Sequence, residues 1–206
     1  MCRGPVPPPN SVSIARLLAV GTRRVLGGAL ALLLGCIPSA AAELDRAGEY
    51  QLKAAYLFNF SQFIEWPDAS FADPAQPFRI CVLGRDPFGD SLRVLESRRY
   101  KQRPIATAHL KDPGEARQCQ ILYLDDDSAA RGEAVIRELA DQAILTVSSR
   151  DGFAALGGAI QFSQQGPRVR MTINLDAARR AQLRVSAKLL EVALQVIGKP
   201  SAGEHG

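Results

Sequence analysis

Apolar residues at helical spacing mark the first part of the chain that has a regular pattern. The segment Glu43–Glu65 reads as one long helix that ends before Trp66 and Pro67. Between Ala54 and Phe60 this helix is apolar almost all round. The pattern therefore predicts a helix wedged between layers or covered by a partner, and ordinary core packing is the favoured interpretation. Its main stripe consists of Leu52, Tyr56, Phe60 and Phe63.

Strand-like segments then alternate with helical ones. Nearly continuous apolar runs are typical of central strands that are covered on both faces. A short helix is expected near Phe88–Leu95, and Ala129–Asp141 has helical spacing. Strand, helix and strand at this spacing indicate right-handed crossovers and a mainly parallel sheet. The expected strands are Phe78–Leu83, Pro104–Leu110, Cys119–Leu124 and Ala143–Ser148.

The pattern changes to period two near the C-terminus. Ala159–Ser163 and Arg168–Asn174 alternate and are separated by a Gly-Pro turn, which predicts an antiparallel hairpin. Its second strand would place Arg168, Arg170, Thr172 and Asn174 on the outward face. Asp176 can cap a short helix through Leu183, and Ser186 can cap a last helix. That helix would pack inward through Leu189, Leu190, Ala193 and Ile197.

These elements predict an α/β fold: a single domain with a mostly parallel central sheet, flanking helices and a C-terminal antiparallel hairpin. The apolar run Val25–Ile37 follows two arginines and precedes a small-x-small site ending at Ala42, the pattern of a cleaved signal peptide. The run is short for a permanent membrane anchor. We therefore expect a signal peptide over residues 1–42, a domain over 43–198 and a disordered tail over 199–206. A lipobox-like Leu33–Cys36 leaves lipidation at Cys36 as the minority alternative.

Charge excludes one class of partner. The leader holds four arginines and no acidic residue, so 25 basic and 21 acidic residues become 21 of each beyond Ala42. A neutral domain without a basic stretch gives no electrostatic support for nucleic-acid binding. No second apolar run of spanning length follows, so the domain is expected to be soluble.

Candidate chemistry is sparse. Asp125–Asp127 follow an apolar strand and could hold Mg²⁺ or Ca²⁺, but helix capping and a solvated turn are favoured. Gly84–Ser91 has the glycine spacing of a phosphate loop, but Asp90 stands where the lysine belongs, so a strand-to-helix turn is favoured. His109 is the one histidine before the tail and has no nucleophile motif beside it. We predict no catalytic residue, metal or cofactor.

Two cysteines remain beyond the leader, Cys81 and Cys119. In an oxidising compartment such cysteines pair, and a structural disulfide is favoured over a free or catalytic thiol. A bridge over this loop would contribute about 3–4 kcal/mol to stability by the chain-entropy estimate.

From about Glu49 to Ile197 the sequence resembles the YfiR-like family of exported regulators. The segments are individually weak, but their order and spacing are specific. They are Tyr50–Phe60 with Trp66 and Pro67, Ile80–Gly84 with Asp86–Phe88, Cys119–Tyr123, Ile144–Ser148, Phe153 with Gly157 and Gly158, Arg168–Leu175, and Ser186–Leu190.

The resemblance implies a non-enzymatic periplasmic protein, often dimeric, with an α/β fold. The best-known member represses an inner-membrane diguanylate cyclase by binding its periplasmic region, and an outer-membrane lipoprotein can sequester it. Cys81 and Cys119 match a family disulfide. That member's additional cysteine pair is missing here, so redox control through it is not expected.

The sequence thus favours a periplasmic regulator that binds the periplasmic part of an inner-membrane signalling protein, represses a diguanylate cyclase and lowers cyclic-di-GMP. Phe58 on the first helix, with Arg168 and Arg170 for orientation, is the candidate partner surface. The alternative is a periplasmic small-ligand sensor that uses Arg168, Arg170 and Asn174 for an anionic or aromatic ligand. A hydrolase built around His109 and Asp125–Asp127 is the third hypothesis.

Overall fold

A computed structural model describes residues 40–125, 129–166 and 168–199. The expected leader up to residue 39 and the tail beyond Lys199 therefore lie outside the described residues. From Leu44 onward the chain forms one compact unit. Its elements, in chain order, are α2 (Ala40–Phe63), β1 (Ile64–Glu65), η2 (Asp68–Ser70), β2 (Phe78–Leu83), α3 (Asp90–Arg93), η3 (Val94–Ser97), β3 (Arg99–Tyr100), β4 (Arg103–Leu110), η4 (Pro113–Gln118), β5 (Ile121–Leu124), α4 (Ala129–Leu139), β6 (Leu145–Ser148), β7 (Ile160–Gln165), β8 (Arg168–Asn174), α5 (Leu175–Arg180), β9 (Arg184–Val185), α6 (Ala187–Glu191) and β10 (Gln195–Ile197).

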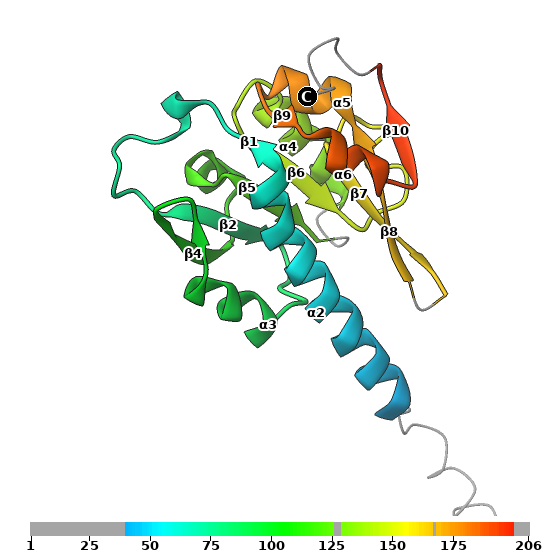
Figure 1. The fold of residues 1–206 in the computed structure, drawn as a ribbon. Coiled ribbons are helices and arrows are strands. Elements are labelled where there is room, and N and C mark those ends of the chain that lie inside the picture. The colour runs from blue at the N-terminus through cyan, green and yellow to red at the C-terminus, as the bar shows by residue number, and fades with distance from the viewer. Residues whose placement is uncertain (1–39, 126–128, 167, 200–206) are drawn as a thin grey trace, which may run out of the picture. The chain divides into compact units, whose positions relative to one another are not determined.

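The main sheet has the strand order β10-β8-β7-β6-β5-β2-β4-β3 in the described part of the chain (Figure 1). From β4 to β7 all neighbours are parallel, and β7 and β8 form an antiparallel hairpin. This confirms the predicted α/β fold with its mostly parallel sheet and hairpin. The chain steps from β2 outward to β4 and then returns to the other side of β2 to form β5. The order therefore reverses between β2 and β5, the point where open α/β sheets form a crevice at the carboxyl ends of the strands.

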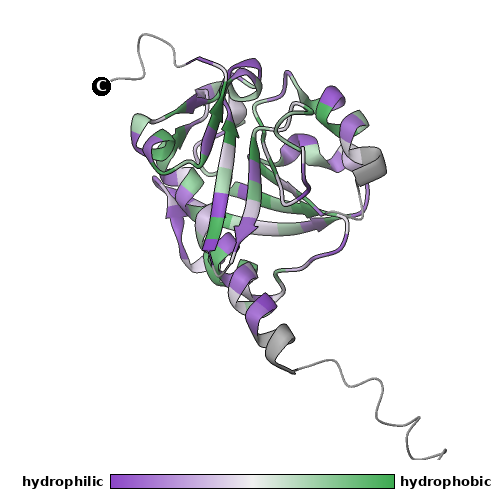
Figure 2. Ribbon diagram, turned by 90° about the vertical axis from the view of Figure 1, so that its right-hand side faces the viewer, coloured by the Kyte–Doolittle hydropathy of each residue, from purple (hydrophilic) through white to green (hydrophobic). Residues whose placement is uncertain are grey.

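Each face of the sheet has its own apolar layer, because successive side chains of a strand point to opposite faces. On one face Phe78 and Ile80 pack with Leu57 and Phe60 of α2. Figure 1 shows α2 crossing this face, and Figure 2 shows hydrophobic residues concentrated along the strands. The opposite layer joins strand residues to α4; its members include Cys81, Leu83, Leu122, Leu124, Val135, Ile136 and Leu139.

The predicted disulfide is confirmed. Cys81 in β2 is bonded to Cys119 in the segment between η4 and β5. Both cysteines are buried in the α4-side layer. The bond thus ties the connection between β4 and β5 to β2, the first strand of the main sheet in chain order.

The end of the first helix differs from the prediction. Helix α2 ends at Phe63, and Ile64 pairs as a strand with Val185 of β9. The carbonyl of Phe63 accepts a hydrogen bond from the Ser186 amide. Pro67 disfavours helical geometry at the residue before it, so the chain leaves the helix in this region and gains strand partners instead.

The C-terminal segment was predicted as one helix through Ile197, and this is wrong. Helix α6 ends at Glu191, and β10 lies parallel to β8 with Val196 opposite Ile173. The Leu194 amide donates to the Met171 carbonyl at 2.8 Å. A sheet edge supplies backbone partners that the local apolar spacing could not reveal. Helix α5 is likewise capped by Asn174, whose side chain accepts from the Ala177 amide, and not by Asp176.

Glu96 connects η3 to β4 through hydrogen bonds of its side chain. Its carboxylate accepts hydrogen bonds from the hydroxyl and the amide of Thr107, which hold the pKa of Glu96 below its ordinary value. Such a group stabilises the fold at pH values above its unfolded pKa, and this contribution is lost as the pH falls through the folded pKa. We expect Thr107→Val to raise the pKa of Glu96 toward its ordinary value, measured by carbon-detected NMR titration. An unchanged titration curve in that variant would contradict this origin of the shift.

Candidate functional site

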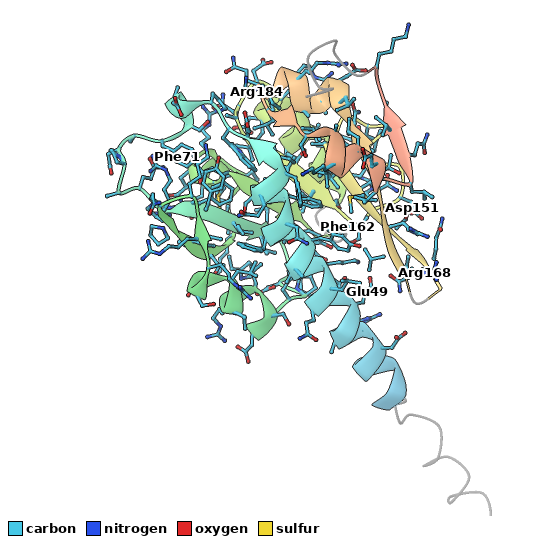
Figure 3. The ribbon with its side chains drawn as sticks, in the orientation of Figure 1. Glu49, Phe71, Asp151, Phe162, Arg168 and Arg184 are labelled. Carbon is cyan, nitrogen blue, oxygen red and sulfur yellow. A yellow bond between two sulfur atoms is a disulfide. The ribbon has the colours of Figure 1, made fainter. Side chains whose placement is uncertain are left out.

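A cleft lies at the carboxyl ends of β2, β5 and β6, where the strand order reverses. Arg85, Asp125 and Ser149 follow these three strands closely and line a cavity of about 660 Å³. This volume falls within the range of small-molecule sites. The other walls come from the N-terminal half of α2 and from β7, which contribute Arg46, Glu49, Tyr50, Lys53, Phe162, Ser163 and Gln164. Figure 3 shows Glu49 on α2 and Phe162 on β7 among these side chains.

Lys53 is a buried cation on one side of this cleft, with 3% of its surface exposed. Its ammonium donates to the Ser149 hydroxyl at 2.7 Å, forms an ion pair with Glu49 at 2.5 Å and lies 4.6 Å from the centre of the Tyr50 ring. The Ser149 hydroxyl also shares a hydrogen bond of 2.9 Å with Tyr123. A buried charge is tolerated when it is paired and hydrogen-bonded in this way.

Lysine, serine and tyrosine in contact invite comparison with an activated serine nucleophile. A base must have a lone pair to take the serine proton. Lys53 Nζ donates to the Ser149 hydroxyl and is ion-paired with Glu49, so in this structure the lysine is the donor of that hydrogen bond. The arrangement therefore positions the Ser149 hydroxyl between Lys53 and Tyr123.

Asp125 is the second buried charge of the cleft, at 4% exposure. Its Oδ2 lies 3.6 Å from Arg85 Nε but accepts no hydrogen bond. The interpretation of a solvated turn is thus wrong for Asp125, because the residue directly follows a strand that is covered on both faces. Residues 126 and 127 of the expected acidic cluster lie outside the described residues.

The sequence contains a signal that marks Lys53 as unusual. Lys53 shares a helical face with Leu57 and Phe60, both of them buried. A single charged residue at the end of an otherwise apolar stripe indicates a buried ion pair or a functional group. Its partner Ser149 is 96 residues away in the chain, so only the fold could identify it.

The hairpin residues proposed from the sequence have different surroundings. Arg168 is exposed, whereas Arg170 is half-buried and its Nε has no hydrogen-bond partner. Asn174 was expected on the outward face but is 6% exposed, because its side chain caps α5 and donates to the Ala154 carbonyl. The structure therefore corrects the exposure of Asn174, whose amide is committed to the fold.

Phe58 is half-buried against the apolar core, with the Arg98 guanidinium 5.7 Å from its ring. Among the described side chains of α2, from Asp45 onward, the large apolar ones that are exposed are Leu52 and Phe63, at 42% and 36%. The exposed apolar side chains of α2 thus lie on a different side of the helix from Phe58. The sequence could not distinguish these positions, because the helix is apolar on most sides.

The other candidates have structural contacts. The His109 ring donates from Nε2 to the Gly84 carbonyl. Asp86 accepts from the amide of Phe88, so the segment after β2 is the predicted strand-to-helix turn. Within the described ranges no group of three metal-ligating side chains comes together. None of the helices in that part of the chain has the length and apolar character to cross a membrane.

Two solved structures resemble parts of this fold weakly. One is described as the ABC domain in complex with L-Trp from Streptococcus pneumoniae, with 12% identity, a TM-score of 0.44, and coverage of 58% of this chain and 55% of that one. The other is a conserved domain protein from Vibrio cholerae O1 biovar eltor, with 13% identity, a TM-score of 0.42, and coverage of 57% and 54%. The chain thus spans just over half the length of each.

The family match is much more extensive. Residues 50–194 match the YfiR/HmsC-like family, a range that runs from the middle of α2 to the start of β10. It includes the disulfide, most of the cleft and the hairpin. On this match the chain belongs to the YfiR/HmsC-like family.

Proposed function

We propose that this protein is a non-enzymatic periplasmic regulator that binds the periplasmic part of an inner-membrane signalling protein and so represses a diguanylate cyclase. The match over residues 50–194 is the observation that carries the proposal, because membership of this family supports a periplasmic regulatory role in cyclic-di-GMP signalling. Export would follow from the signal peptide over residues 1–42, with lipidation at Cys36 as the alternative. The domain over 43–198 would act as a homodimer and would be sequestered by an outer-membrane lipoprotein.

The outer face of α2 is the surface that this function would use. Leu52 and Phe63 are exposed there, eleven residues apart, which is close to three full helical turns, so both lie on one side of the helix. Ala55 and Asn59 lie between them and are exposed as well. Exposed apolar side chains of this size contribute to protein interfaces when they form a continuous patch.

We expect Leu52→Asp to weaken partner binding tenfold or more and to relieve repression, because it replaces one of the two large exposed apolar side chains of this face with a charge. Val94→Asp is the matched control, since Val94 is an exposed apolar residue on η3. The measurements are a cyclic-di-GMP reporter in cells and capture of the partner's periplasmic segment in vitro. Circular dichroism checks that both variants are folded. Full repression by a folded Leu52→Asp protein would exclude this face.

In this proposal Arg168 and Arg170 set the orientation in which the partner binds, and a change at Arg168 tests this role. Charge reversal at exposed Arg168 should slow association with the partner and change the salt dependence of association, as charges at the rim of an interface do. The lifetime of the complex should change less.

Phe58→Ala should lower the melting temperature, because Phe58 packs against the core. If Phe58→Ala keeps its stability and loses only partner binding, the ring belongs to the interface and our assignment of Leu52 and Phe63 is wrong.

A further inference from the structure

Four cations lie close together in the β3–β4 hairpin and directly before it, at the edge of the main sheet that is remote from β10 (Figure 1). They are Arg98, Arg99, Lys101 and Arg103. The first three are exposed, and Arg103 is half-buried. The expectation of a domain without a basic stretch is therefore wrong for residues 98–103, which we call the basic hairpin.

The four cations of the basic hairpin form no ion pair with any described residue. Elsewhere, exposed arginines such as Arg93 and Arg184 are paired with carboxylates. Glu96 is the acidic residue nearest in sequence, but its carboxylate accepts hydrogen bonds from Thr107. Asp73 gives its carbonyl to Arg103, while its carboxylate accepts from the Ala75 amide. The hairpin thus presents positive charge that these carboxylates do not pair.

The basic hairpin lies far from the described cleft along the strands. Strands β4, β2 and β5 are parallel, and Arg103 is at the amino end of β4. Asp125 follows β5 at the carboxyl end, and the gap at residues 126–128 comes directly after it. The hairpin and this acidic segment of the chain therefore adjoin opposite ends of the parallel strands.

Lys101 occupies a backbone conformation that favours glycine. Its φ is 52°, in the left-handed region, where the Cβ of any residue other than glycine is crowded. Non-glycine residues in this region are uncommon and cluster at functional sites. The Lys101 ammonium lies 5.4 Å from the centre of the Tyr100 ring. The turn thus keeps a cation at a position where glycine would be less strained.

Lipid headgroups suit this surface better than a protein or a nucleic acid does. Protein interfaces are anchored by aromatic or apolar side chains, and single-stranded nucleic acids stack their bases on aromatic rings. Tyr100 is 3% exposed, and Phe58 and Phe71 are partly buried, so the rings near the cations offer little free surface. An anionic lipid surface needs a cluster of cations within reach, and each lysine or arginine strengthens its binding.

We propose that the basic hairpin docks this protein onto an anionic lipid surface through Arg98, Arg99 and Lys101. Docking would concentrate the protein at a membrane and would take no part in recognising a protein partner. The hairpin shares no residue with the proposed partner surface at Leu52 and Phe63. The proposal therefore goes beyond the proposed function, and either one can hold without the other.

Vesicle sedimentation tests the docking, with the chain from residue 43 onward because it contains the compact unit. This protein should bind vesicles of equimolar phosphatidylcholine and phosphatidylglycerol but not vesicles of phosphatidylcholine alone. Added salt should weaken the binding steeply, because it screens exposed charges. Arg99→Gln together with Lys101→Gln should weaken binding by about 25-fold, which corresponds to about fivefold for each cation removed.

Arg180→Gln together with Lys188→Gln is the matched control. Both residues are exposed cations, on α5 and α6, and their loss changes the net charge by the same amount. This variant should bind anionic vesicles almost as well as the parent. An equal loss in both double variants would overturn the proposal, because net charge and not the hairpin would then determine binding.

Lys101→Gly separates docking from folding. Binding to anionic vesicles should weaken by about fivefold, while the melting temperature should stay the same or rise, because glycine adopts a positive φ without strain. Gln182→Gly is the control, since Gln182 has a φ of 57° outside the hairpin. It should change the melting temperature in the same direction and leave vesicle binding unchanged.

The proposal fails if the parent binds anionic and neutral vesicles equally, or if the Arg99 and Lys101 double variant binds as the parent does. Binding of polyglutamate without binding of vesicles would assign the hairpin to an acidic protein partner instead. If the double variant self-associates while its vesicle binding is unchanged, the cations serve to keep the sheet edge from pairing with another sheet, and the proposal is wrong.

Discussion

Replacing Cys81 and Cys119 together by alanine is expected to lower the free energy of unfolding by about 3–4 kcal/mol. The bond closes a loop between residues 38 apart in sequence, and its loss restores that freedom to the unfolded chain. Both side chains are almost completely buried, so alanine is preferable to serine, which would add buried hydroxyls without partners. Urea denaturation of the purified domain measures the difference.

Reduction of the parent protein provides the matched control. Dithiothreitol should shift the parent's urea midpoint toward that of the alanine pair and should leave the pair itself unchanged. Thiol counting on denatured, unreduced parent protein should detect no free cysteine from residues 81 and 119. An equal midpoint for oxidised and reduced parent would show that the bond contributes nothing to stability.

Strands with strong local signals could be predicted from the sequence. Cys119–Leu124 and Ala143–Ser148 are apolar at nearly every position, and the structure covers β5 and β6 on both faces. Helix α4 between them is correct to within two residues at its end. These elements are defined by their own composition, because burial on two sides demands apolar residues whatever the rest of the chain does.

The sequence-based predictions were wrong where an element or side chain depends on partners far away in the chain. The segment Gln195–Ile197 has apolar residues compatible with a helix or a strand, and pairing with β8 decides between them. Asn174 is the last residue of a strand with an alternating pattern, which predicts an outward side chain. Its side chain instead points inward, because it caps α5 by accepting a hydrogen bond from the Ala177 amide. In both cases a hydrogen bond to another element overrides the local period.

The cleft could be predicted only in part. The position of Asp125 after an apolar strand indicated a ligand-binding edge, but its burial depends on neighbours from α2 and β7. Those elements are far apart in the sequence, and the hydrogen bond from Lys53 to Ser149 joins two of the three walls. A site assembled at a reversal of strand order becomes visible once that order is known.

Removal of Glu49 should cost more than removal of Lys53, although the two form one ion pair. Glu49→Gln leaves the Lys53 ammonium buried with Ser149 and the Tyr50 ring as its remaining partners. An uncompensated buried charge is strongly unfavourable, so we expect a loss of about 2–3 kcal/mol. Lys53→Met leaves Glu49, whose side chain is 24% exposed and can be hydrated. That loss should be below about 1 kcal/mol, since Met preserves the apolar stem.

The double variant Glu49→Gln with Lys53→Met tests why the two single changes are expected to differ in their stability losses. Once Lys53 is methionine, the Glu49→Gln change no longer strands a charge, so the double variant should be about as stable as Lys53→Met alone. The coupling energy from urea denaturation of the four proteins should therefore nearly equal the cost of Glu49→Gln. Glu191→Gln, at an exposed carboxylate of α6, controls for the chemical change itself and should have almost no effect. If the free-energy losses of the two single changes simply add in the double variant, groups other than Glu49 compensate the charge of Lys53. The burial of Lys53 beside the cleft would then not depend on Glu49.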